Sequence, residues 1–222
     1  MRIEKQTYLN AKSVGSGRTI SGLELVRCAF TGSNLSQFDD PELGLVVREV
    51  TATRCAAARS FLHGVRVEDV VVDGLTTTSG LQLFGCGLRH VTLRGRVGTW
   101  FVIAPNPTLP GDVRAAFTTA LVKYYQGVDW ALDITEAEFD SANLSFVPGD
   151  LVRRDPETQF LLRRSSFADV DPGTLPSYAS IAVRRFEETP LDSIVAVAAP
   201  RSKRFAESLA HLQELRDRGL AE

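Results

Sequence analysis

Four stretches of the chain repeat one order of apolar and small residues: LVRCAFTG (25–32), VREVTATR (47–54), VEDVVVDG (67–74) and LRHVTLRG (88–95). Their central apolar residues, Cys28, Val50, Val70 and Val91, follow one another at steps of 22, 20 and 21 residues. An apolar column that recurs at a nearly constant period indicates a repeat protein in which one short strand per repeat stacks on the next. The pattern predicts a mainly β protein, a short right-handed parallel β-helix with 20–22 residues per coil.

Second strands lie between these stretches and repeat with a similar period. Leu62 and Leu83 are 21 residues apart, and so are Leu81 and Val102. The intervening segments are rich in Val, Leu, Thr and Phe, which favour the pleated positions of strands. At least two faces of each coil are therefore predicted to repeat.

The repeat ends at a proline-rich loop, APNPTLPGD (104–112), after which residues 112–126 carry apolar side chains at helical spacing. We therefore expect a β-helix domain over residues 1–165 that includes a helix inserted near 112–126. A helical C-terminal cap is expected over residues 166–222, because helical patterns cover 175–188, a short stretch before Pro200, about 189–199, and 202–218.

The apolar stripe of the last predicted helix has two interpretations. Phe205, Leu209, Leu212 and Leu215 share one side of a helix over 202–218. The stripe either covers the open last coil of the β-helix or forms the seam of a homodimer. Monomer and homodimer both remain open, and the first interpretation is preferred because exposed strand edges need covering.

The charge balance and the cysteines exclude several classes of protein. The 25 basic and 27 acidic residues give a net charge of -2, which indicates neither a nucleic-acid-binding protein nor an acidic mimic of nucleic acid. No apolar stretch is long enough for a membrane span, and no apolar run follows the first charges, so a cytoplasmic protein is expected. Cys28, Cys55 and Cys86 occupy apolar positions without CxxC or HxxxH spacing, so neither a metal nor another cofactor is expected.

Two blocks of the chain resemble pentapeptide repeats, CAFTGSNLSQ (28–37) and AEFDSANLSF (137–146). In that family a small residue precedes a central Leu or Phe by two positions. The matching central residues are Phe30, Leu35, Phe139 and Leu144, and the matching small residues are Cys28, Ser33, Ala137 and Ala142. The resemblance implies a right-handed quadrilateral β-helix with four pentapeptides per coil, although the middle stretches carry bulkier aliphatic residues than the family pattern.

The alignment of the four stretches produces the first candidate site. Glu49, Asp69 and His90 immediately precede the central apolar residue of their strands, in the column that begins with Arg27. Neighbouring strands lie about 4.8 Å apart, so these side chains should stack on the outer surface. Asp69 would then orient His90 as a general base or a ligand. The alternative is a solvated face, because Arg48, Glu68 and Arg89 form an alternating charge column beside it and no nucleophile falls in register.

A second candidate site lies on the strand after the inserted helix. Glu136, Glu138 and Asp140 share one face of that predicted strand. Three carboxylates on one face suit either Ca²⁺ coordination or the paired acids of a glycosidase, and they also suit an ordinary polar surface.

Because no convergent catalytic set accompanies the repeat, the sequence favours a non-enzymatic protein-interaction or scaffold protein. The expected partner is another protein rather than nucleic acid or a membrane, and a bacterial immunity or target-shielding role fits this class by analogy of fold. The alternative is a small-ligand or carbohydrate-active enzyme with a site on the β-helix face, using Glu49, Asp69 and His90 or the Glu136, Glu138 and Asp140 face.

Overall fold

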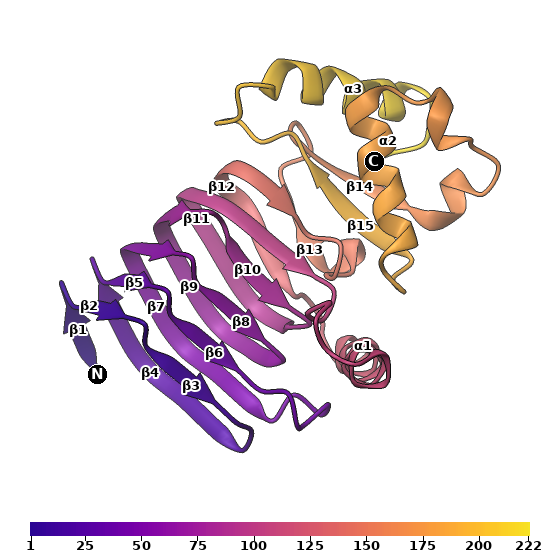
Figure 1. Ribbon diagram of the computed structural model, residues 1–222. Helices are drawn as coiled ribbons and strands as arrows, with labels where there is room; N and C mark the ends of the chain where they lie inside the picture. The colour runs from indigo at the N-terminus through magenta and orange to yellow at the C-terminus, as the bar shows by residue number, and fades with distance from the viewer.

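The computed structural model describes all 222 residues as a mainly β protein with three α-helices (Figure 1). The helices are α1 (Gly111–Tyr125), α2 (Ser177–Arg184) and α3 (Phe205–Asp217). The strands are β1 (Arg2–Glu4), β2 (Thr7–Leu9), β3 (Lys12–Val14), β4 (Arg18–Val26), β5 (Ala29–Thr31), β6 (Asn34–Ser36), β7 (Leu45–Ala58), β8 (Phe61–His63), β9 (Val65–Thr78), β10 (Leu81–Phe84), β11 (Gly87–Ile103), β12 (Leu132–Asn143), β13 (Val152–Arg153), β14 (Gln159–Arg163) and β15 (Ser193–Val197).

Thirteen strands form one large sheet, and every strand pair in it is parallel. The main path runs β1-β4-β7-β9-β11 and returns as β10-β8-β6-β3. The sheet curls through 253° as a half-barrel, which Figure 1 shows as a stack of curved ribbons. Apolar side chains on its concave side belong to the larger of two buried clusters, which has 37 buried residues and also takes in residues of α1 and β15.

The long strands contain single residues in the left-handed backbone region at five-residue intervals. In β7 and the chain that follows it these are Glu49, Arg54, Arg59 and Gly64, with φ between 51° and 64°. Residues other than glycine adopt this region rarely, because Cβ approaches the backbone there. A left-handed residue interrupts the extended run, so each of these positions is a corner at which the strand changes direction.

The predicted register is correct for the middle of the sheet. Val50 lies opposite Val70, and Val70 lies opposite Val91. Leu62 lies opposite Leu83, also as predicted.

The first step of the predicted register is wrong. Leu23, and not Cys28, lies opposite Val50, so the step is 27 residues. Ala29 lies opposite Ala56, which places Cys28 level with Cys55. The extra residues form the loop 38–44 between β6 and β7. The predicted pairing of Leu81 with Val102 is also wrong, because Leu81 lies opposite Trp100.

The inserted helix is confirmed as α1, which lies beside the curled sheet (Figure 1). Its side chains Phe117, Leu121 and Tyr125 are buried against the larger cluster. The Tyr125 hydroxyl also accepts a hydrogen bond of 3.3 Å from the backbone N–H of Leu88 in β11. These contacts fix the end of α1, and with it the residues that follow, against the sheet.

The C-terminal region gathers beyond β12 (Figure 1) and has its own buried cluster of 13 residues. Helices α2 and α3 confirm the helices predicted over 175–188 and 202–218. The helix predicted over 189–199 is wrong, because Ser193–Val197 form β15, which pairs antiparallel with β14. All five residues of β15 are buried, so the apolar run has no amphipathic period that distinguishes strand from helix. The domain boundary at residue 165 stays a prediction.

The stripe on α3 packs within its own chain. Leu212 and Leu215 are fully buried in the C-terminal cluster, and Phe205 and Leu209 pack against it. Each of the three helices is too short or too polar to pass through a lipid bilayer.

Candidate functional site

The side chain of His90 has a carboxylate at each of its two ring nitrogens. Its Nδ1 lies 2.9 Å from Oδ1 of Asp69, and its Nε2 lies 2.7 Å from Oδ1 of Asp129. Asp69 and His90 are corners of adjacent strands, with φ of 53° and 54°. The shared left-handed backbone places both side chains at the same edge, and the parallel register brings them into contact.

Glu49 precedes this pair in the same column, because its neighbours Arg48 and Val50 lie opposite Glu68 and Val70. Its φ of 55° marks it as a corner too. Glu49 nevertheless makes no ion pair or side-chain hydrogen bond, so the predicted column divides into a joined Asp69–His90 pair and a free carboxylate. The position level with Glu49 in β4 is Gly22, so the placement of Arg27 at the head of this column is wrong.

The segment after α1 closes over the imidazole. The ring of Trp130 stacks on His90 with centroids 4.7 Å apart, and the guanidinium of Arg153 lies 4.1 Å from the centroid of the Trp130 ring. The backbone N–H of His90 also donates a hydrogen bond of 3.2 Å to the carbonyl of Trp130. His90 therefore connects β11 to residues that are distant in sequence.

A second charge group lies beside this pair and includes a buried carboxylate. Glu68 is only 7% exposed, and its Oε2 lies 3.1 Å from Nη2 of Arg89. Arg89 also lies 3.8 Å from Asp69, which links the two groups. The hydroxyl of Tyr124 in α1 donates to Oε1 of Glu68 at 3.3 Å. The predicted alternation of Glu68 and Arg89 is therefore a real ion pair, and α1 completes it.

The carboxylates determine the protonation of His90. Its hydrogen bond to Asp129, followed by that to Asp69, raises the pKa of His90 above its ordinary value. The same bond to His90 lowers the pKa of Asp129. A doubly protonated ring donates through both nitrogens, one to each carboxylate. This arrangement stabilises an imidazolium and leaves neither nitrogen free to accept a proton from a substrate.

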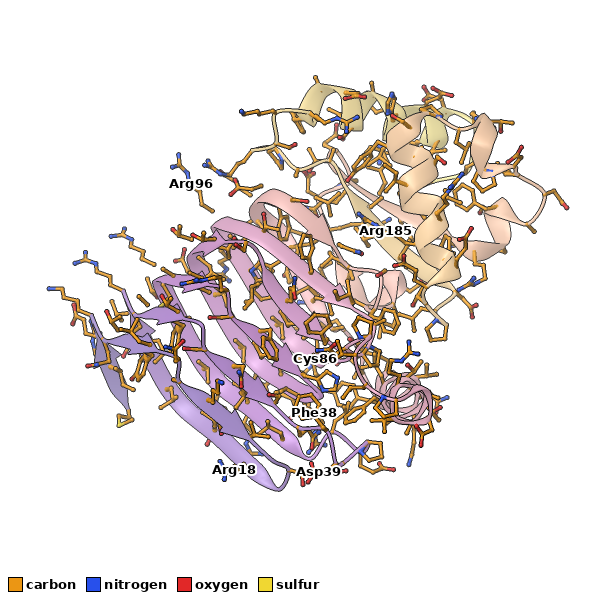
Figure 2. The ribbon with its side chains drawn as sticks, viewed as in Figure 1. Arg18, Phe38, Asp39, Cys86, Arg96 and Arg185 are labelled. Carbon is orange, nitrogen blue, oxygen red and sulfur yellow. The ribbon has the colours of Figure 1, made fainter.

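No side-chain nucleophile contacts His90. Cys86, four residues before His90 in the chain, is fully buried inside the curled sheet (Figure 2), and burial raises the pKa of its thiol to about 12. A buried protonated thiol is unreactive. The geometry around His90 therefore supplies a charged, partly exposed surface and no assembled acyl-transfer set.

The second candidate site is divided among arginine partners. Asp140 lies 2.9 Å and Glu138 4.0 Å from the guanidinium of Arg201, which precedes α3. Glu136 lies 3.7 Å from Arg94 of the neighbouring strand. The three carboxylates are exposed on one face of β12, as predicted, but two of them contact the C-terminal region.

Another corner of the sheet carries three cations in succession, followed by Gly74 and Gly95. Lys5, Arg27 and Arg54 are level with one another in successive strands, because the backbone N–H of Lys5 donates to Val26 and that of Arg27 donates to Thr53. All three residues have φ of 52° to 53°, and none forms an ion pair. We call these three residues the basic column.

Sequence reasoning missed Asp129, Trp130 and Arg153 around His90, and it missed the basic column. The first three come from segments outside the repeat, so no periodic pattern marks them. The basic column was hidden by the wrong first register, which separated Arg27 from Arg54. Comparison with known proteins identifies no matching family model, no matching curated protein and no matching solved structure.

Proposed function

We propose that the curled sheet is a short right-handed quadrilateral β-helix built from pentapeptide-like units. The five-residue spacing of left-handed corners supports this, because four such units make the 20-residue step from Val50 to Val70. The units that resemble pentapeptide repeats support it too. Their small residues Cys28, Ser33, Ala137 and Ala142 and their central residues Phe139 and Leu144 are buried, while Phe30 and Leu35 are partly buried against the same cluster.

We propose that the protein is a non-enzymatic interaction scaffold that binds an acidic protein partner. The basic column is the observation that carries this proposal. Strands in a sheet lie about 4.8 Å apart, so Lys5, Arg27 and Arg54 hold like charges at close spacing without any carboxylate in ion-pair reach. Like charges in register destabilise the free protein, whereas an acidic partner would convert the repulsion into attraction.

The charges around the basic column support a docking surface rather than a small anion site. Arg59, at the corner that directly follows β7, is exposed and unpaired. Arg96 of β11 points away from the sheet (Figure 2). The cations are thus spread along the outside of the sheet and do not converge on one point. An extended, rigid face of this kind suits a protein partner.

The rival function is a small-ligand or carbohydrate-active enzyme that uses the outer face. The Asp69–His90 pair is the observation in its favour. Against it, both ring nitrogens of His90 are bound to carboxylates, Glu49 stands apart, and Arg201 holds two of the three carboxylates of β12. These contacts are more typical of structural ion pairs than of a catalytic site whose groups are free to contact a substrate.

The interaction proposal is tested by charge reversal. A tagged Arg27→Glu/Arg54→Glu variant and the wild type are used to capture proteins from lysate of the source cells, with mass spectrometry as the readout. The control is Arg114→Glu/Lys203→Glu, which changes the net charge equally at exposed, unpaired positions elsewhere. An acidic protein captured by the wild type and the control but lost from the column variant supports the proposal. Equal capture by all three, capture of nucleic acid, or capture of nothing contradicts it.

A further inference from the structure

The concave side of the sheet contains an apolar cavity of about 440 Å³ between the first strands and β11. Eighteen of its 23 lining residues are hydrophobic. They include Phe30, Leu35, Val47, Leu62, Ala52 and Ala57. A volume of this size falls within the range of about 300–1,000 Å³ that holds small ligands.

Two alanines explain why this part of the interior is hollow. Ala52 lies opposite Leu25 on one side and Val72 on the other, and Ala57 lies level with Phe30. The neighbouring strands thus place larger side chains where β7 has only methyl groups. Protein interiors are normally packed without such voids, because unfilled space loses dispersion contacts. An apolar occupant would restore them.

Two serine hydroxyls in the wall have partners, whereas the buried indole N–H of Trp100, which also belongs to the lining, has none. The hydroxyl of Ser33 has the carbonyl of Tyr8 or of Thr31 as its acceptor, at 3.4 and 3.3 Å. The hydroxyl of Ser60 has the carbonyl of Phe30 or of Ala58, at 3.4 and 3.1 Å. Water needs two to four polar partners to occupy a cavity, and the unpaired donor of Trp100 alone does not supply them. The cavity therefore selects for hydrocarbon.

Cations flank the end of the cavity that reaches the first strands. The lining includes Ala11, Lys12 and Ser13, and β1 and β3 are the two ends of the sheet path, with no element paired beyond them. Arg18 donates to the hydroxyl of Ser13 at 3.1 Å, and neither Arg18 nor Lys12 has a carboxylate within ion-pair distance. Figure 2 shows Arg18 at the edge of the sheet.

We infer that this cavity binds a long-chain fatty acid or a similar single-chain anionic amphiphile. The hydrocarbon chain fills the space beside Ala52 and Ala57, and the carboxylate lies at the mouth near Lys12 and Arg18. A second copy of the chain stacked on this end is disfavoured, since the unpaired cations of the two copies would face each other. The inference is independent of the basic column, which lies on the outer surface.

The test is titration of the purified full-length protein with a fluorescent fatty-acid analogue, followed by displacement with palmitate. Ala52→Leu/Ala57→Leu fills the cavity and should weaken binding at least tenfold. Ala56→Leu/Ala58→Leu places the same substitutions on the same strand outside the lining and should leave binding unchanged. Lys12→Ala/Arg18→Ala should weaken palmitate but not the uncharged hexadecanol.

Circular dichroism and thermal melts establish that each variant is folded. If the filled variant does not fold, the wild type is labelled instead with a photoreactive palmitate analogue. Labelling of peptides that contain lining residues, such as Phe30, Leu35, Val47 or Leu62, is the expected result. No displaceable binding by the wild type, equal binding by the filled variant, labelling only of peptides outside the cavity lining, or end-to-end self-association that blocks the analogue would each overturn the inference.

Discussion

Asp69 Oδ1 lies 2.9 Å from His90 Nδ1, at matching left-handed corners of adjacent parallel strands. Asp129, which follows α1, holds the other ring nitrogen at 2.7 Å. The imidazole thus connects two corners of the sheet to the segment after the inserted helix. Its role is positional, and it joins parts of the chain separated by 39 residues.

The first prediction is that stability depends on pH through His90. Because the folded state raises the pKa of His90, its contribution to the free energy of unfolding is fully present below the unfolded value of about 6.5. The contribution is lost as pH rises through the folded pKa. The stability difference between wild type and His90→Gln, from denaturant titrations, should therefore be larger at about pH 5.5 than at about pH 9. A stability difference between wild type and His90→Gln that grows with pH would contradict a raised pKa of His90 in the folded state.

The second prediction assigns the cause of that raised pKa. In NMR titrations of the imidazole, Asp129→Asn and Asp69→Asn should each lower the pKa of His90, because each removes a hydrogen-bonded carboxylate. Asp112→Asn, which removes an exposed carboxylate in the first turn of α1, is the control and should change nothing. If neither Asp129→Asn nor Asp69→Asn changed the pKa of His90, the hydrogen bonds from His90 to these two carboxylates would be contradicted.

The third prediction concerns two glycine corners with nearly equal φ, 64° at Gly98 and 65° at Gly22. A Cβ at Gly98 would lie 2.4 Å from Oγ1 of Thr77, whereas a Cβ at Gly22 meets nothing within 4 Å. Gly22→Ala should cost about 1–2 kcal/mol of backbone strain. Gly98→Ala should cost about 1–3 kcal/mol more because it also overpacks the corner. Chemical denaturation measures both, and equal costs would mean that the corner at Gly98 is not closely packed.

The fourth prediction tests whether the carboxylates of β12 serve the structure. A double-mutant cycle with Asp140→Asn and Arg201→Gln should give a coupling of about 0.2–1 kcal/mol, as expected for an exposed ion pair. Addition of Ca²⁺ should not raise the thermal midpoint of the wild type. A large Ca²⁺-dependent increase that disappears in Asp140→Asn would instead favour a metal site.

The fifth prediction separates the basic column from the surface around His90 as the binding face. Asp69→Asn and His90→Gln should capture the same acidic partner as the wild type, since the basic column lies at a different corner. If these variants lost capture and Arg27→Glu/Arg54→Glu retained it, the partner would bind at the surface around His90 and not at the basic column.

The register was predictable where the chain keeps one period and was not where a loop breaks it. Val50, Val70 and Val91 align because the steps between them contain only strands and corners. The step before Val50 contains the additional loop 38–44. The left-handed corner residues repeat every five residues along the strands. A shift by one such unit places Cys28 on an equally apolar column, so the sequence alone does not separate the two alignments.

The site was predictable in part for the same reason. Asp69 and His90 meet because both occupy the same position in regular strands, which the alignment revealed. Asp129 and Trp130 reach His90 only because α1 packs on the sheet and returns the chain to it. Such a contact depends on tertiary packing across an insertion, and no local spacing encodes it.

The most direct test of the scaffold account is site-specific photocrosslinking. A photoreactive amino acid replaces Thr53, next to Arg54 in the basic column, or Thr119, on the exposed side of α1, as the matched control. The account predicts a crosslink to one acidic protein from position 53, weakened by high salt and absent from position 119. No crosslink at position 53, or equal crosslinks at both positions, would contradict it.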